Sequence, residues 1–147
     1  MAAKIVVGVD GSDGSLRALR WAAEEARLRD AVLEVVTSWH YPVLATIPAF
    51  GVLPPADDMS DEARKGLVEL LESEGITNSS GLTVLETVAE GPAAGVLVDA
   101  AQDADMVVLG SRGHGGFSGL LLGSVSQAVV SHARCPVVVV PPADRGQ

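Results

Sequence analysis

The stretch MVVLGSRGHGGFSGLLLGSVS, residues 106–126, is the one around which this chain is organised. A short apolar run over 106–109 ends abruptly at Gly110 and is followed by a loop, 111–116, with almost no side-chain bulk. Glycines adopt the positive φ values that turn successive backbone N–H groups into one concavity. A helix predicted from Ser124 adds free amides and the positive end of its dipole. Both features attract an anion, usually phosphate, so we interpret this stretch as the phosphate half of a nucleotide site.

Composition limits the functions open to this chain of 147 residues. Hydrophobic residues make up 48% and charged residues 20%, which is typical of one globular domain. The net charge of −9 argues against binding to nucleic acid or to an anionic membrane, because both need basic patches. A single cysteine, Cys135, cannot form an internal disulfide, which favours the reducing cytoplasm. No signal peptide is visible, and no apolar run approaches the ~20 residues that span a bilayer.

Five short apolar runs alternate with helical patterns along the chain. The run over 5–9 is rich in β-branched residues, a pattern typical of a strand buried on both faces. The run over 82–88 is half polar, which suits the edge of a sheet better than its centre. The alternation predicts one α/β domain over 1–147, a doubly wound parallel sheet of five strands with helices on both faces. The strands are expected at 5–9, 32–39, 82–88, 106–109 and 137–140, with helices beginning near 16, 58, 91 and 124.

A proline-rich segment, 40–57, interrupts this alternation. Its four prolines forbid a regular helix, so we expect a long surface loop, a kind of segment that often acts as a lid or a contact surface. Residues 141–147 are expected to form a polar tail.

The common phosphate-binding motifs do not fit the glycine loop. A Walker A loop needs Gly-Lys followed by Ser or Thr, and the sequence contains neither combination. A dinucleotide fingerprint starting in this loop fails because Ser118 stands where its third glycine is required. The pattern that does fit is Gly110-x2-Gly113-x9-Gly123-Ser124.

On this motif the chain resembles the ATP-binding branch of the universal stress protein family, whose hallmark loop has the form G-2x-G-9x-G-[S/T]. The resemblance extends to the opening 5–12, the turn 90–92 and the closing 135–140, and it covers essentially the whole chain. Actinobacterial members, which have a proline-rich middle loop, resemble it most. The resemblance implies a Rossmann-like, adenine nucleotide alpha hydrolase-like sheet with strand order 3-2-1-4-5. In that order the loops after the first and fourth strands meet at the topological switch point, where such sheets bind ligands.

The resemblance also implies an ATP site with Mg²⁺ or Mn²⁺ at these two loops. Gly8 and Val9 would approach the ribose and adenine, and Ser38 at the end of the second strand would bond adenine through its backbone. Asp10 would lie near the phosphates and help to hold the metal ion. The other candidates, which would surround the ribose and phosphates, are Ser12, Gly110, Ser111, Arg112, Gly113, His114, Gly115, Gly116, Gly123, Ser124, Val125 and Ser126.

Several of these residues also have structural explanations. Ser124 and Gln127 form a capping-box pattern, and Asp10 and Ser12 are suited to cap the first helix. His114 is a lone loop histidine without a partner carboxylate in the motif, so we assign no catalytic residue.

Two classes of function remain open. In the leading hypothesis the chain is a cytoplasmic, ATP-binding stress-response regulator rather than an enzyme. Bound ATP would order the glycine loop and change a surface that an unidentified protein partner reads. The alternatives are a slow ATPase or phosphoryl- or adenylyl-transfer enzyme, and a member of the family that binds cyclic AMP. If Val137–Val140 lies at the sheet edge, its open hydrogen-bonding row predicts a homodimer through this strand, which the resemblance also implies.

Overall fold

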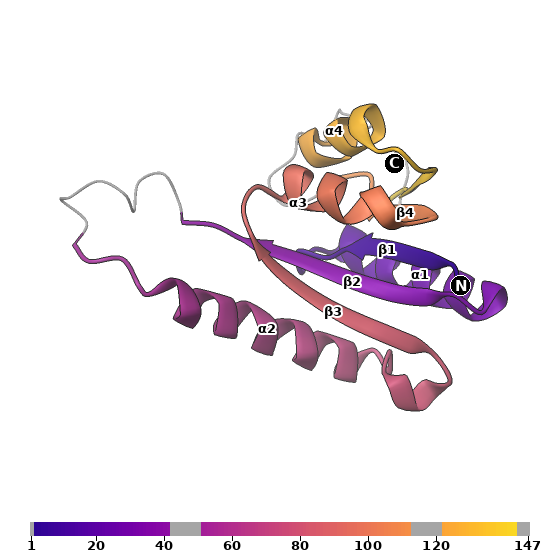
Figure 1. The fold of residues 1–147 in the computed structure, drawn as a ribbon, viewed down its shortest axis with the longest axis horizontal. Coiled ribbons are helices and arrows are strands. Elements are labelled where there is room, and N and C mark those ends of the chain that lie inside the picture. Colours follow the sequence, from indigo (N-terminus) through magenta and orange to yellow (C-terminus); the bar gives the residue numbers. More distant parts are fainter. Residues whose placement is uncertain (1, 42–50, 113–121, 144–147) are drawn as a thin grey trace.

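The computed structural model describes residues 2–41, 51–112 and 122–143, and its five strands form one parallel sheet (Figure 1). The strand order is β3-β2-β1-β4-β5. This is the order that the family resemblance implies, so the predicted fold class is confirmed. The strands are β1 (Lys4–Gly8), β2 (Val32–Trp39), β3 (Thr83–Glu90), β4 (Met106–Gly110) and β5 (Val137–Val140).

The burial of the strands follows their sequence patterns. Ile5, Val6 and Val7 of β1 are at most 1% exposed, as expected for a central strand covered on both faces. Ile5 and Val7 belong to the core cluster on the α1 and α2 side, whereas Val6 belongs to the cluster on the α3 and α4 side. The half-polar strand β3 lies at one edge of the sheet, where Leu85 is 48% exposed. The prediction of an edge strand at this position is confirmed.

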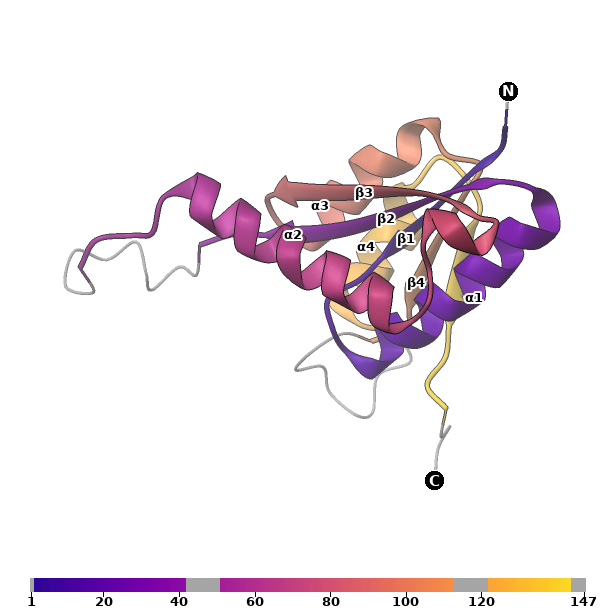
Figure 2. The same ribbon diagram turned by 90° about the horizontal axis from the view of Figure 1, so that it is seen from below.

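Helices cover both faces of the sheet. In Figure 2, α1 (Asp13–Arg29) and α2 (Ala56–Ser73) lie on the near side, and α3 (Ala93–Ala100) and α4 (Ser124–His132) lie behind the strands. Short 3₁₀ helices, η3 (Asn78–Ser80) and η4 (Ala101–Asp103), follow α2 and α3. Within the described ranges, none of these helices has both the length and the hydropathy that a bilayer crossing requires.

Two helices begin earlier than the periodicity of apolar residues predicts. α1 begins at Asp13 rather than near residue 16, because Ser12 acts as its N-cap and the polar first turn carries no apolar signal. α2 begins at Ala56 rather than at residue 58, directly after Pro55. Proline is tolerated at the N-terminal boundary of a helix. The helix therefore starts inside the segment 40–57 that was expected to be a loop.

An ionic cluster lies near the amino ends of β1 and β2. The Nζ atom of Lys4 is 2.7 Å from Asp103 Oδ1 and 3.0 Å from Glu34 Oε2. The hydroxyl of Thr87 donates to Glu34 Oε1 at 2.7 Å. Hydrogen bonding to Lys4 holds the pKa of the Asp103 carboxyl below its usual value. The cluster therefore links β1, β2, β3 and η4, and it lies away from the carboxyl ends of the strands, where the glycine-rich loop after β4 begins.

Two leucines of α1 test how this helix packs. Leu19 is 0% exposed and Leu28 is 77% exposed. We expect Leu19→Ala to lower the free energy of unfolding by about 3 kcal/mol, because it opens a cavity between α1 and the sheet. We expect Leu28→Ala to change it by less than about 0.5 kcal/mol. Urea unfolding followed by circular dichroism measures both values, and similar losses in the two variants would contradict this packing.

Candidate functional site

The first turn of α1, directly after the turn that follows β1, lies backbone to backbone against the end of β4 and the turn that follows it. A Cβ atom added to Gly110 would lie 2.9 Å from the carbonyl carbon and oxygen of Gly14. A Cβ atom added to Gly14 would lie 2.9 Å from the carbonyl oxygen of Arg112. Real Cβ atoms do not approach backbone so closely, which explains why both positions are glycine. The two glycine-rich turns therefore converge at the carboxyl ends of the central strands.

The turn after β1 is organised around Asp10. Its Oδ1 atom accepts hydrogen bonds from the backbone N–H of Ser12 at 2.9 Å and from the Ser12 hydroxyl at 2.5 Å. The Ser12 hydroxyl oxygen accepts from the backbone N–H of Ser15 at 3.2 Å, so Ser12 caps α1 as predicted. Gly11, between them, has a φ of 84°, a conformation that favours glycine. These bonds hold the exposed carboxylate of Asp10 beside the start of α1.

The turn after β4 is tied to the start of α4. The carbonyl oxygen of Ser111 accepts from the backbone N–H of Gly123 at 2.6 Å and from the hydroxyl of Ser126 at 2.7 Å. The Ser111 N–H donates to the carbonyl oxygen of Val140 in β5 at 3.0 Å. Ser111 and Ser126 are both buried. The hydroxyl of Ser126 thus faces the protein interior, and the backbone N–H is the group of this residue that lies in the first turn of α4.

The capping-box interpretation of Ser124 is wrong. The N-cap of α4 is Gly123, which has no side chain to offer, and the N–H of Gln127 donates to the Gly123 carbonyl at 2.9 Å. The side-chain Nε2 of Gln127 donates to the carbonyl oxygen of Leu122 instead, at 2.9 Å. Ser124 is the first residue of the helix and its side chain is exposed. The N–H groups of Ser124, Val125 and Ser126 therefore have no acceptor within the helix and mark its positive end.

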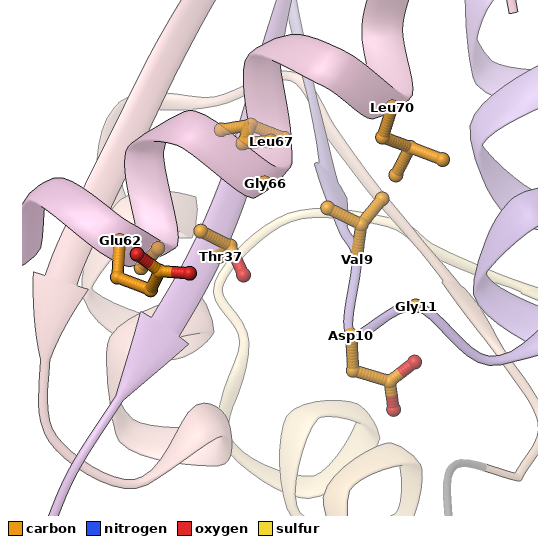
Figure 3. Close-up of a pocket in the computed structure, with 9 residues that line it drawn as sticks. Val9, Asp10, Gly11, Thr37, Glu62, Gly66, Leu67 and Leu70 are labelled. Atoms are coloured by element: carbon orange, nitrogen blue, oxygen red, sulfur yellow. The ribbon is translucent and has the colours of Figure 1, made fainter. Parts of the chain in front are cut away.

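A cavity of about 310 Å³ lies between the carboxyl ends of β1 and β2 and the helix α2 (Figure 3). This volume is at the lower end of the range typical of small-molecule sites. The walls of the cavity are apolar, and three polar side chains, those of Asp10, Thr37 and Glu62, stand around it. The other lining residues are Val9, Gly11, Ala63, Gly66, Leu67 and Leu70.

The structure brings some predicted site residues to this cavity and places others beside it. Val9 and Asp10 line it, and the N–H of Val9 donates to the Val36 carbonyl at 2.9 Å. Gly8 instead lies against α3, where an added Cβ would come within 2.8 Å of Leu97 Cδ1. Ser38 is one residue beyond the lining residue Thr37, and successive side chains of a strand point to opposite faces.

Other predicted residues stand in the turns or outside the described part of the chain. A second group lies near the contact between the start of α1 and the end of β4, as the contacts above show. Its members are Gly110, Ser111, Arg112, Gly123 and the first turn of α4. The candidates that lie outside the described residues are Gly113, His114, Gly115 and Gly116.

Sequence reasoning missed the contribution of α2 and of Thr37. Two signals were present: Thr37 shares the alternation of the buried residues Leu33 and Val35, and Gly66 interrupts an otherwise regular helical pattern. Neither signal tells which helix lies above the end of the strand.

The side chains near the cavity suit a metal ion that is bound together with a ligand rather than by the protein alone. In the described part of the chain, His, Cys, Asp and Glu side chains do not gather in groups of three that could hold a metal ion. The carboxylate of Asp10 stands in the glycine-rich turn after β1, at the border of the cavity. Magnesium is commonly held by one or two carboxylates together with phosphate oxygens, so this arrangement suits a metal–nucleotide complex.

Comparisons with known proteins agree with this architecture. Residues 1–141 match the sequence profile of the universal stress protein family. A universal stress protein of Mycolicibacterium smegmatis is 37% identical over 141 residues, which cover 92% of this chain and 47% of that protein. The chain thus spans about half the length of the curated relatives it matches.

Two solved structures of similar proteins contain adenine nucleotides. A universal stress protein from Archaeoglobus fulgidus in complex with dAMP is 29% identical, with a TM-score of 0.61 over 93% of this chain and 96% of that one. A universal stress protein in complex with cAMP is 28% identical, with a TM-score of 0.63 over 94% and 95% of the two chains.

Two serines of α4 differ in how much the fold depends on them: Ser126 is buried and hydrogen-bonded, whereas Ser124 is exposed. We expect Ser126→Ala to lower the free energy of unfolding by about 1–2 kcal/mol, because it removes the buried donor that holds the Ser111 carbonyl. We expect Ser124→Ala to change it by less than about 0.5 kcal/mol, because Ser124 is exposed and caps nothing. Chemical denaturation measures both, and a larger loss in Ser124→Ala than in Ser126→Ala would contradict the described start of α4.

Proposed function

Because this chain belongs to the universal stress protein family, we propose that it binds ATP and acts in the cytoplasm as a regulator of the stress response. The nucleotide would lie across the carboxyl ends of β1 and β4, with its base in the α2 cavity and its phosphates at the first turn of α4. Binding would change the surface around these elements, and an unidentified protein partner would read that change.

The observation that carries this proposal is the backbone contact between the first turn of α1 and the end of β4. The backbone of Gly14 lies against Gly110, and the Ser111 carbonyl accepts from the Gly123 N–H, so the turn at Asp10, the turn at Ser111 and the start of α4 are held near one another. Backbone N–H groups and a helix N-terminus in such an arrangement suit a chain of phosphates. In a chain with a net charge of −9, these local dipoles supply the attraction that the overall charge does not.

The solved relatives support an adenine base but leave the number of phosphates to experiment. They are complexes with dAMP and cAMP, which each carry one phosphate. We favour ATP because the spacing Gly110-x2-Gly113-x9-Gly123-Ser124 matches the loop of the ATP-binding branch. Mg²⁺ or Mn²⁺ carried by the phosphates would be held by Asp10 and would offset part of the phosphate charge.

We further propose a homodimer through β5. This strand pairs with β4 on one side and forms the edge of the sheet on the other. Its four residues are all valine, an apolar and β-branched edge that pairs readily with a second strand. A two-fold copy of the same chain satisfies both edges at once.

Ser124→Glu tests the phosphate position. We expect wild-type protein to bind Mg-ATP in isothermal titration calorimetry, and the variant to bind it at least about tenfold more weakly because a carboxylate repels phosphate. The melting temperature should stay unchanged or rise, because an acidic residue stabilises the first turn of a helix.

Ser131→Glu is the matched control, since it adds the same charge near the other end of α4 and should leave the affinity for Mg-ATP unchanged. Titration of wild-type protein with AMP and cAMP ranks the ligands. Absence of adenine nucleotide binding by the wild type, or equal affinity in Ser124→Glu, would refute the proposed site.

Sedimentation velocity tests the dimer. We expect wild-type protein to sediment as a dimer at micromolar concentration, and Val138→Lys to shift it to the monomer because a charge on the edge strand opposes pairing. A monomeric wild type would contradict the proposed assembly.

A further inference from the structure

Gly66 occupies an unusual position in α2. It lies in the interior of an 18-residue helix, where glycine forms a less stable helix than alanine does. Packing does not require it, because a Cβ atom added there would meet nothing within 4 Å. Nor does the backbone, since Gly66 is absent from the glycines with positive φ in the described chain. What Gly66 does is border the cavity at the ends of β1 and β2.

The surroundings of Gly66 combine apolar walls with acceptor groups. Leu67, Leu70 and Val9 form the apolar part of the cavity, and Leu67 is only 3% exposed. Glu62 of α2 and Thr37 of β2 add a carboxylate and a hydroxyl to the lining of the same cavity (Figure 3). A flat ring with an exocyclic amine suits such a space, because its faces are apolar and its amine donates hydrogen bonds.

Building on the nucleotide site proposed above, we propose that α2 determines which base that site accepts. The bare backbone at Gly66 makes room for a flat aminopurine ring, and Glu62 accepts a hydrogen bond from the amine at position 6 of that ring. An ionised carboxylate is an acceptor only. It therefore favours a 6-amino ring and disfavours a 6-oxo ring, whose oxygen it would face without an intervening proton.

The charges around the cavity give the ligand one orientation. Glu62 borders the cavity on the α2 side, so a phosphate group placed between α2 and β2 would meet its carboxylate. The first turn of α4 presents N–H groups and the positive end of a helix dipole instead. A nucleotide is thus favoured with its base between α2 and β2 and its phosphates toward α4.

Gly66→Ala tests the room-making role through two readouts of opposite sign. The added methyl group should raise the melting temperature by about 2–4 °C through helix propensity. It should weaken binding of Mg-ATP at least about fivefold, because it fills space that the ring needs. A purely structural glycine would not separate stability from binding in this way.

Gly95→Ala is the matched control. Gly95 lies in α3, away from the cavity, and a Cβ atom added there also meets nothing within 4 Å. This variant should gain stability and keep wild-type affinity for Mg-ATP. If wild type and Gly66→Ala bind Mg-ATP equally, the role of α2 is refuted while the proposed function stands. If wild type does not bind at all, both are refuted.

Glu62→Gln tests selection of the amine. A glutamine amide donates as well as accepts, so the variant should tolerate a 6-oxo ring. We expect the preference for ATP over ITP to fall about tenfold. The ratio of the two affinities cancels any general effect of the lost charge on phosphate binding. Asp61→Asn, an adjacent exposed carboxylate that does not line the cavity, should leave the ratio unchanged. An unchanged ratio in Glu62→Gln would refute the role of Glu62.

Discussion

The close approach of Gly14 and Gly110 is the constraint on which the rest of the site depends. Side chains at these positions would push the start of α1 away from the end of β4. Without them the backbones touch, and the Ser111 carbonyl can in turn hold Gly123 and Ser126 at the start of α4. The ends of two strands and the starts of two helices, α1 and α4, are thereby brought together at the carboxyl end of the sheet.

The two ends of the sheet differ in chemistry. Near the amino ends, Lys4 is joined to Glu34 and Asp103 by short ion pairs, so polar groups there are matched to each other within the chain. At the carboxyl ends, an apolar cavity with acceptors around it lies on the α2 side, and the positive end of α4 lies on the other side of the sheet. The two features at the carboxyl ends suit the two halves of the proposed nucleotide: the cavity suits its aromatic amine, and the start of α4 suits its phosphates.

The local sequence predicted the elements of the fold better than the details of the site. Apolar runs located the five strands: a continuous run marks the central strand β1, which is buried on both faces, and a half-polar run marks the edge strand β3. The strand order came from the family resemblance. The start of α1 was misplaced because Asp13 and Gly14 carry no apolar periodicity. The N-cap of α4 is Gly123 rather than Ser124 because a long-range bond to Ser111 fixes it. The part played by α2 was beyond local reasoning, since it depends on which helix lies above the end of β2.

The most direct measurement of the central claim is a titration of ¹⁵N-labelled protein with Mg-ATP, followed through backbone amide resonances. The account predicts that the largest shifts occur together at Gly11, Ser111 and Val125, in the two turns and the first turn of α4, with further shifts at Thr37 beside the cavity. Shifts confined to the amino ends of the strands, around Lys4 and Asp105, would contradict it.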